Sequence, residues 1–467
     1  MRVLALDQGT TSTRLLLADG AGLRVLGQLR HAVRHPAPGH VEQDAAEILA
    51  NCRSLLDAAG PADALGLANQ GESCLAWDAL TGVPLSQVIV WQDRRTRADL
   101  ERIAAEGLAD EVRARAGLPL DPYFSAAKLA WLLREIPAVA EARRKGRLRL
   151  GTTDAFLLQR LTGHCATDRA TASRTSLMNL STGAWDADLC RIFGVPMSCL
   201  PEIRNNVAGF GHVNGVPVTA AIVDQQAALY GHGCRNAGEA KITFGTGAFA
   251  LVVTGTTRPD NPGNLLPTIA WDLGAGMTYA LDGGVQDAGS AVEWALRAGI
   301  AREIADFDDF PNAPAIDRGL VFVPAFSGLG APHWDRSAAP LIIGLTPEMF
   351  RRDLCQALLE GIAFQTAALL DEMAQAQPLA TPVAVDGGLS ASDYFIRFLA
   401  QVSQRSITIS GFAEQTAFGT AALAALALGV QLTVPSTSCP PIVPTQHRPD
   451  WTARFALGLG RSQGWLC

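Results

Sequence analysis

Residues 3–18 read VLALDQGTTSTRLLLA, which is the pattern of a β-hairpin. The apolar runs Val3–Leu6 and Leu15–Ala18 flank a polar turn over Gln8–Ser12, and this turn is rich in small and hydroxyl-bearing residues. Glycine lets such a turn approach a ligand closely, and its hydroxyl and N–H groups can bind phosphate oxygens. Taken alone, the stretch is more typical of an ordinary hairpin turn than of a ligand site.

The second half of the chain repeats this pattern without repeating the sequence. Ala240–Phe244 and Ala248–Val253 are apolar runs, and Gly245-Thr246-Gly247 forms the turn between them. Two nearly equal halves that each begin with a Gly/Thr hairpin predict an α/β protein that clamps a nucleotide between two domains.

We place the domain boundary near Cys234–Gly238, where glycine and asparagine interrupt the chain. This divides the chain into an N-terminal domain, residues 1–234, and a C-terminal domain, residues 235–467. Apolar periodicity predicts helices at 96–116, 125–145, 286–300, 347–375 and 390–404.

A third glycine-rich turn, Asp386-Gly387-Gly388-Leu389-Ser390, follows the apolar run Val383–Val385 and precedes a predicted helix. Two glycines at a strand-to-helix turn allow a flat ligand to lie on the backbone, with the helix N-terminus facing it. The chain has no GxxxxGK[ST] phosphate-binding loop. Each of the three turns is a weak signal, but together they follow the order expected of a two-domain nucleotide clamp.

Asp224 is the candidate for a catalytic base. It ends an apolar run and is followed by two glutamines, in the stretch VDQQA. A carboxylate at a strand end can accept a proton from a substrate hydroxyl, although aspartate is also favoured at the start of a helix. The stretches Asn69-Gln70-Gly71-Glu72 and Trp91-Gln92-Asp93-Arg94-Arg95 also follow apolar runs, where the ligand cleft of an open sheet lies.

The composition limits the possible partners. The 467 residues carry a net charge of −7, with 48% hydrophobic and 18% charged residues, which argues against non-specific binding of nucleic acid. No run approaches the roughly 18 uninterrupted apolar residues that would indicate a membrane span. The nine cysteines are scattered without CxxC or metal-type spacing. We therefore expect a cytoplasmic protein with reduced thiols and a small-molecule ligand.

Long stretches of the chain resemble the FGGY carbohydrate kinases, and within that family the glycerol kinase branch. The matching stretches cover nearly the whole chain: LALDQGTTSTR (4–14), GHVEQD (39–44), IVWQDRRT (89–96), DPYFSAAKLAWLL (121–133), TDRATASRTSLMN (167–179), VDQQAALYG (223–231), FGTGAF (244–249), FVPAFSGLGAPHWD (322–335), IGLTPE (343–348), DGGLSAS (386–392) and TAFGTAALA (416–424).

The resemblance implies two ribonuclease H-like (actin-like ATPase) domains around a central cleft. It also implies ATP- and Mg²⁺-dependent phosphorylation of a terminal hydroxyl of a small polyol or sugar, with the substrate mainly on the N-terminal domain and ATP mainly on the C-terminal domain. Asp224 would be the general base, and Asp7 would face Mg²⁺ through water. The implied substrate ligands are Gly71, Glu72, Trp91, Tyr123, Asp224, Gln225 and Phe249. The implied nucleotide ligands are Thr10, Thr11, Ser12, Arg14, Thr246, Gly247, Gly289, Glu293, Gly388 and Ser392.

The chain departs from the glycerol kinase pattern at three of these positions. Gly71 stands where those kinases carry an arginine that binds glycerol, and Glu293 and Ser392 replace a glutamine and an asparagine near the nucleotide. Gly71 leaves two alternatives open. Either the acceptor is a longer polyol or ketose that extends into the vacated space, or Arg94 or Arg95 moves in and restores glycerol binding.

Two other functions would share the fold. An actin-like or chaperone-type ATPase would phosphorylate no substrate, and it has no need of Asp224 beside Glu72, Trp91 and Tyr123. A kinase-derived regulatory protein would have a damaged substrate site, whereas Asp224 and the three turns are intact. The sequence leaves the assembly open, with a homodimer or a homotetramer as the expected forms.

Overall fold

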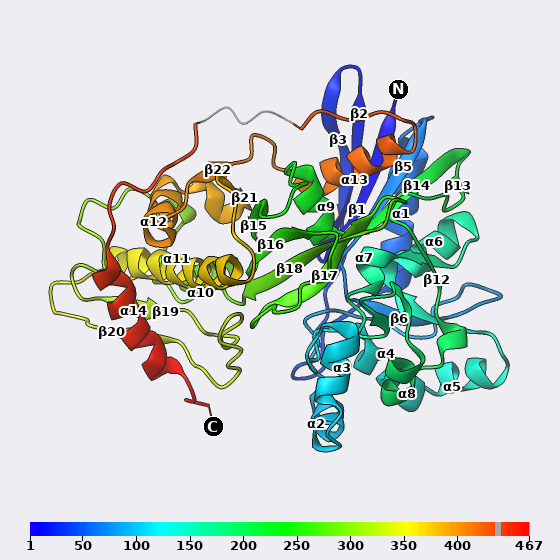
Figure 1. Ribbon diagram of the computed structural model, residues 1–467, viewed down its shortest axis with the longest axis horizontal. Helices are drawn as coiled ribbons and strands as arrows, with labels where there is room; N and C mark the ends of the chain where they lie inside the picture. Colours follow the sequence, from blue (N-terminus) through cyan, green and yellow to red (C-terminus); the bar gives the residue numbers. More distant parts are fainter. Residues whose placement is uncertain (435–439, 467) are drawn as a thin grey trace.

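The computed structural model describes residues 1–434 and 440–466, which form two α/β halves, each built on a six-stranded sheet (Figure 1). The strands of the N-terminal sheet, in order across it, are β13 (His212–Val213), β14 (Val216–Val223), β5 (Ala64–Asn69), β1 (Val3–Gln8), β2 (Ser12–Asp19) and β3 (Gly22–Arg30). The strands of the C-terminal sheet are β17 (Leu266–Asp272), β18 (Met277–Val285), β16 (Ala248–Gly255), β15 (Ala240–Phe244), β21 (Val383–Gly387) and β22 (Ile407–Ile409).

Five strands of the two sheets correspond in position, and the sixth lies at opposite edges: β13 beside β14 in one sheet and β17 beside β18 in the other. In the N-terminal sheet β1, β2 and β3 form an antiparallel meander, and β5 and β14 continue the sheet parallel to β1. In the C-terminal sheet β15, β16 and β18 form the meander, and β21 and β22 are the parallel strands. Both predicted hairpins and the predicted two-domain α/β fold are therefore confirmed.

The first hairpin forms because its strands are apolar on both faces. All six residues of β1 are buried, as expected of a central strand that is covered by helices on both sides. Its register pairs Val3 with Ala18 and Asp7 with Arg14, which leaves residues 9–11 to form the turn. The turn therefore lies at the end of the sheet where β5 and β14 also end.

Short strands and fourteen described helices complete the fold. The remaining strands are β4 (Glu42–Gln43), β6 (Cys74–Asp78), β7 (Val88–Ile89), β8 (Leu148–Thr152), β9 (Ala166–Asp168), β10 (Met178–Asn179), β11 (Ala184–Trp185), β12 (Glu202–Arg204), β19 (Val321–Val323) and β20 (Leu341–Ile343). The helices of the N-terminal half are α1 (Ala45–Ala58), α2 (Arg97–Ala105), α3 (Ala109–Ala116), α4 (Ser125–Glu135), α5 (Pro137–Arg144), α6 (Thr153–Thr162), α7 (Arg169–Ala172), α8 (Ala187–Phe193) and α9 (Asp224–Gly231). Those of the C-terminal half are α10 (Gly289–Arg297), α11 (Arg351–Ala376), α12 (Asp393–Ser403), α13 (Gln415–Leu426) and α14 (Pro449–Ser462).

Two predicted helices are each divided in the structure. The predicted helix at 125–145 breaks into α4 and α5 at Ile136, which is extended because Pro137 follows it and disfavours helical geometry at the preceding residue. The predicted helix at 96–116 breaks near Gly107, which has a positive φ of 77°. The helices predicted at 286–300, 347–375 and 390–404 are confirmed as α10, α11 and α12, with shifted ends.

Helix α13 comes from the C-terminal half of the chain but lies beside the N-terminal sheet (Figure 1). It packs along α9 and against β1 and β5, and its buried alanines share one apolar cluster with residues of both sheets. Glycine makes the close approach of the two helices possible, because a Cβ on Gly419 would overlap the carbonyl oxygen of Ala227. The pair α9–α13 therefore connects the two halves, and a boundary at 234/235 remains a prediction.

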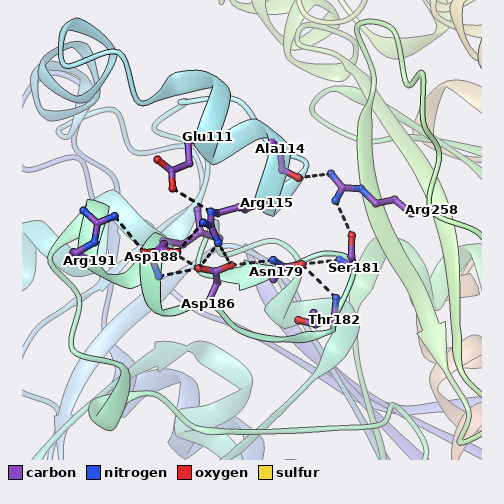
Figure 2. Close-up of polar contacts among 11 residues, drawn as sticks. Glu111, Ala114, Arg115, Asn179, Ser181, Thr182, Asp186, Asp188, Arg191 and Arg258 are labelled. Atoms are coloured by element: carbon purple, nitrogen blue, oxygen red, sulfur yellow. Dashed lines mark hydrogen bonds and ion pairs between the residues drawn. The ribbon is translucent and has the colours of Figure 1, made fainter.

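A polar contact at the edge of the molecule also joins the halves (Figure 2). Arg258, which follows β16, donates hydrogen bonds to Ser181 Oγ at 2.8 Å and to the Ala114 carbonyl at 2.7 Å. On the N-terminal side, Arg115 of α3 forms ion pairs with Asp186 and Asp188. The arginine from one half thus binds a surface of the other half that is itself held together by ion pairs.

Within residues 1–434 and 440–466, no helix is long and apolar enough to cross a membrane. The seven cysteines in the described segments form no disulfide with one another, and six of them are buried. Cys439 and Cys467 lie outside the described residues.

Candidate active site

A cavity of about 170 Å³ lies where the two halves meet, at the carboxyl ends of β5 and β14. Parallel strands end at the same edge of a sheet, so the residues that follow β5 and β14 come together there with the β1–β2 turn. The β15–β16 turn of the C-terminal sheet closes the other side. The cavity is lined by Thr10, Gln70, Glu72, Trp91, Tyr123, Arg174, Val223, Asp224, Gln225, Gln226, Thr243, Gly245, Thr246, Phe249 and Asp282.

Three aromatic rings form an apolar wall of the cavity. Trp91 lies 5.6 Å from Tyr123 and 6.0 Å from Phe249 between ring centroids, both edge-to-face. The indole N–H of Trp91 donates to Thr10 Oγ1 at 3.0 Å. Lys128, fully buried on α4, donates to the carbonyls of Trp91 and Tyr123 at 3.2 and 2.8 Å and so holds both backbones in place. The wall can cover the carbon chain of a small polyol.

Asp224 lies directly after β14 and begins α9. Its Oδ1 accepts a hydrogen bond from its neighbour's backbone N–H, Gln225 N, at 2.7 Å. Burial raises the pKa of Asp224 to about 7, and the negative charges of Asp7 and Glu72 add to the shift. A carboxylate of this basicity can accept a proton near neutral pH.

Gln225, the next residue, also faces the cavity. Its side-chain oxygen accepts a hydrogen bond from Lys241, a fully buried lysine on β15 of the C-terminal sheet, whose ammonium also donates to Thr243 Oγ1 at 3.0 Å. This contact fixes the orientation of the Gln225 amide.

Glu72 forms a buried ion-pair chain that the sequence analysis missed. Arg174 Nε donates to Glu72 Oε1 at 2.7 Å, and Arg174 Nη2 lies 2.9 Å from Asp282 Oδ2. The only sequence signal was that Arg174 is the one charged residue in the small, polar run ATASRTS, while Asp282 precedes two glycines without further pattern. Both residues line the cavity beside Asp224.

Gly71 is buried but lines neither this cavity nor the wider one beside it. Its φ is +79°, and a Cβ there would lie 3.3 Å from Val223 Cγ2. Gly71 itself therefore contributes no atom to the lining of either cavity, although its neighbours Gln70 and Glu72 line the smaller one. Arg95, one of the two expected replacements, is held elsewhere by buried ion pairs with Asp93 and Glu42, both at 2.7 Å.

A second cavity of about 390 Å³ adjoins the first. The two share Trp91, Tyr123, Thr246 and Phe249, so the smaller cavity opens into the wider one. Arg94, Ser290, Ser327 and Arg336 are among the other residues that line the wider cavity. Thr246 therefore borders both cavities.

The predicted nucleotide ligands fall into two sets. Thr10 and Thr246 line the smaller cavity with Asp224. The remaining eight lie outside its lining, namely Thr11, Ser12, Arg14, Gly247, Gly289, Glu293, Gly388 and Ser392. Of these, Gly388 is exposed with no atom within 4 Å of a Cβ position, which suits a flat ligand on the backbone.

Several members of the second set already have structural partners. The N–H of Gly289 donates to the Gly245 carbonyl at 3.0 Å, which packs the start of α10 on the β15–β16 turn. Ser392 caps the N-terminus of α12 by accepting from the Phe395 N–H at 3.3 Å. Arg14 forms an ion pair with Glu414 at 2.6 Å.

Asp7 is the candidate carboxylate for a metal ion. Burial raises the pKa of Asp7 to about 6, and the guanidinium of Arg14 partly offsets that shift. In the described part of the chain, no group of three or more His, Cys, Asp or Glu side chains is placed to hold a metal ion. A carboxylate beside a turn rich in hydroxyl and N–H groups fits a magnesium ion that keeps most of its water and takes further ligands from substrate phosphates.

Comparisons with known proteins agree over the whole chain. The N-terminal domain model of the FGGY family of carbohydrate kinases matches residues 2–231, and the C-terminal domain model matches residues 240–428. A glycerol kinase of Ralstonia nicotianae is 42% identical over 447 residues, which cover 91% of this chain and 90% of that one.

Solved structures show the same similarity. The glycerol kinase of Plasmodium falciparum, crystallised with ADP, has a TM-score of 0.89 and 30% identity, covering 99% of this chain and 98% of that one. A xylulose kinase from Brucella ovis has a TM-score of 0.85 and 25% identity at the same coverage.

Proposed function

The chain belongs to the FGGY family of carbohydrate kinases and transfers phosphate from ATP to a hydroxyl of a small polyol or sugar; we propose that this acceptor is glycerol and that Asp224 is the general base. The carboxylate of Asp224 shares one small cavity with an apolar wall and with the Thr246 turn of the other half, and this arrangement carries the proposal. Family membership favours a kinase over the actin-like ATPase and the regulatory protein.

In this mechanism Asp224 takes the proton of the acceptor hydroxyl as its oxygen attacks the γ-phosphorus of ATP, and ADP leaves. Phosphoryl transfer asks little covalent chemistry of the protein, so positioning and charge neutralisation do most of the work. Trp91 and Phe249 cover the carbon chain of the acceptor, and Glu72 and Gln225 are the polar groups for its hydroxyls.

For the nucleotide we propose the hydroxyls of Thr10, Thr11, Ser12 and Thr246 with Arg14 and Gly247 at the phosphates. Gly289, Glu293, Gly388 and Ser392 are proposed at the nucleoside. Mg²⁺, held through water at Asp7, would offset the charge of the transferring phosphoryl group. We keep a cytoplasmic location and a homodimer or homotetramer as predictions.

Glycerol is preferred to a longer acceptor for two reasons. Glycerol kinases resemble this chain in both sequence and structure, with 42% identity to that of Ralstonia nicotianae and a TM-score of 0.89 to that of Plasmodium falciparum. The argument for a longer acceptor rested on space at Gly71, and Gly71 borders neither cavity. The wider cavity beside the first would still admit a longer chain, so the acceptor has to be measured.

The test is a coupled assay of ADP formation with Mg-ATP and a panel of acceptors: glycerol, dihydroxyacetone, erythritol, xylitol and xylulose. We expect kcat/KM for glycerol to exceed that for each other acceptor by at least about tenfold, the cost of one poorly matched hydroxyl. A tetritol or pentulose that matches or exceeds glycerol would overturn the proposed acceptor.

Asp224→Asn tests the base. The amide keeps the shape but cannot take the proton, so kcat should fall by about 10²- to 10⁴-fold while KM for both substrates changes little. Glu360→Gln is the matched control, because Glu360 is another buried carboxylate whose pKa is raised to about 7 by burial, and it lines neither cavity. Turnover in Asp224→Asn within tenfold of the wild type would remove Asp224 from the mechanism.

A further inference from the structure

Arg174 is fixed on three sides in the acceptor cavity. It follows α7, and its side chain is only 3% exposed. Two carboxylates hold the guanidinium: Glu72 at Nε, 2.7 Å away, and Asp282 at Nη2, 2.9 Å away. The rings of Tyr123 and Phe124 lie against it, with centroids 5.6 and 5.5 Å from Cζ. A side chain held in this way presents its remaining N–H groups in one direction.

Two polar atoms of this arrangement have no partner. Arg174 Nη1 and Asp282 Oδ1 are buried, and neither makes a hydrogen bond to any described residue. The other polar atoms of the two side chains, Arg174 Nε and Nη2 and Asp282 Oδ2, all take part in ion pairs. Leaving a polar atom of a buried charged group without a hydrogen bond is costly, and native structures provide partners for nearly all such atoms. The missing partner is therefore expected to come from a ligand in the cavity that both residues line.

A hydroxyl group matches this pair of atoms. Nη1 can only donate a hydrogen bond and an ionised carboxylate oxygen can only accept one, whereas a hydroxyl does both. Among the described residues that line the cavity, Arg174 is the only lysine or arginine, and Gly71 supplies no side chain. No other cationic side chain on that lining can therefore make a charge-assisted bond to an acceptor oxygen.

We propose that Arg174 and Asp282 together bind an acceptor hydroxyl other than the one that is phosphorylated. Arg174 Nη1 donates a hydrogen bond to the oxygen of this hydroxyl, and Asp282 Oδ1 accepts a hydrogen bond from its O–H. This rests on the proposed function, in which Asp224 binds the hydroxyl that reacts. Arg174 comes from the N-terminal half and Asp282 from β18 of the C-terminal half. The hydroxyl thus bridges the two halves, so the acceptor stabilises the closed arrangement in which transfer occurs.

The opposite view is that Arg174 and Asp282 only hold the two halves together. The chain supplies a matched control for that view. Arg169, five residues earlier, forms an ion pair with Asp272 of β17 and so also connects the halves, but neither residue lines the acceptor cavity. Arg169→Lys therefore reports the effect of weakening an ion pair between the halves without touching the acceptor.

The experiment compares glycerol with propane-1,2-diol and propane-1,3-diol, each of which lacks one hydroxyl. In the wild type, kcat/KM for glycerol should exceed that for the diol without the recognised hydroxyl by about 10- to 150-fold, the effect of a charge-assisted hydrogen bond. In Arg174→Lys and Asp282→Asn this ratio of kcat/KM values should fall most of the way to one. The reason is that kcat/KM for glycerol drops in these variants, whereas kcat/KM for the diol without the recognised hydroxyl changes little. Arg169→Lys should keep the ratio.

Three results would overturn the proposal. The first is a wild type that treats glycerol and both diols alike. The second is an equal loss on glycerol and diols in Arg174→Lys or, if that variant does not fold, in Asp282→Asn. The third is an equal change of the ratio in Arg169→Lys. If the acceptor panel instead identifies another polyol, the proposed acceptor fails, and the same comparison with deoxy analogues of that polyol decides the role of Arg174.

Discussion

Asp224 is a buried carboxylate among other acidic groups. Burial raises the pKa of Asp224 to about 7, and Asp7 and Glu72 add to the shift. A general base is most effective when its pKa is close to the working pH, because it is then both deprotonated and strongly basic. An exposed aspartate, with a pKa near 4, would be a much weaker base. The basicity of Asp224 is therefore a property of its environment.

This environment predicts the pH dependence of the reaction. Protonation removes the base, so kcat/KM for the acceptor should fall about tenfold per pH unit below about 7. Because the pKa of Asp7 is also raised, to about 6, the profile should steepen toward lower pH as the two neighbouring groups titrate together. A profile of initial rates that is flat between about pH 5.5 and 8 would contradict the assignment.

Stability measured over the same range separates this effect from unfolding. The folded-state pKa of Asp224 lies above its unfolded value of 3.8, so the folded state binds more protons between these values. The contribution of Asp224 to stability therefore increases as the pH falls from about 7 toward 4, and it is lost as the pH rises through 7. Between about pH 7 and pH 4 the activity should therefore fall, whereas Asp224 should not lower the midpoint temperature of thermal unfolding.

At the scale of secondary structure, the contact of α9 with α13 depends on small residues. Gly419 on α13 and Gly231 on α9 lie where a Cβ would overlap backbone atoms of the facing helix. The two helices lie between the sheets, and α9 begins with Asp224. A shift of α9 would therefore move the catalytic carboxylate.

Gly419→Ala should destabilise the protein by about 1–3 kcal/mol, because a methyl group has no room between the helices. Gly460→Ala is the matched control in another helix, since a Cβ on Gly460 of α14 meets no atom within 4 Å. That control should stabilise by up to about 1 kcal/mol, because alanine is a better helix former than glycine. Urea denaturation followed by circular dichroism measures both, and equal effects in the two variants would show that the helix contact tolerates a methyl group.

At the scale of the whole molecule, the halves are joined at several separate places. The cavity holds Arg174 and Asp282, α13 crosses to the N-terminal sheet, and Arg258 reaches α3 at the edge (Figure 2). Kinases of this kind must open for substrate and close for transfer, since closure excludes water from the reacting phosphate. Contacts at the edge are exposed and weak enough to break in each cycle.

Arg258→Ala should loosen the edge contact and leave the chemistry unchanged. Exposed polar contacts contribute about 0.2–1 kcal/mol, so amide hydrogen exchange in α3 and around residues 256–264 should rise by no more than about fivefold. The control is Arg397→Ala, whose exposed ion pair with Asp393 lies within one helix of the C-terminal half. Faster exchange at α3 in both variants, or in neither, would show that Arg258 does not connect the halves.

The local pattern of the sequence determined the strands, the turns and most of the residue types at the site. Val3–Leu6 and Leu15–Ala18 form the predicted hairpin because apolar runs around a small polar turn have few other ways to bury their side chains. Glu72, Trp91 and Asp224 follow apolar strands, as the sequence pattern indicated, and they line one cavity with Tyr123 and Phe249, which the family resemblance implied. The sequence also carried the signal for the break at Ile136–Pro137, which the predicted helix at 125–145 overlooked, since proline restricts the residue before it.

Only the tertiary structure decided the contacts between residues far apart in the chain. Arg174 meets Glu72, 102 residues away, and Asp282 from the other half; no periodicity signals such a pairing. For the same reason, the sequence pattern could not predict the surroundings of Gly71 or the packing of α13 against the N-terminal sheet. Local patterns record which face of an element is buried, whereas the partner of a buried charge is fixed by how whole elements pack, and that packing depends on all of the chain at once.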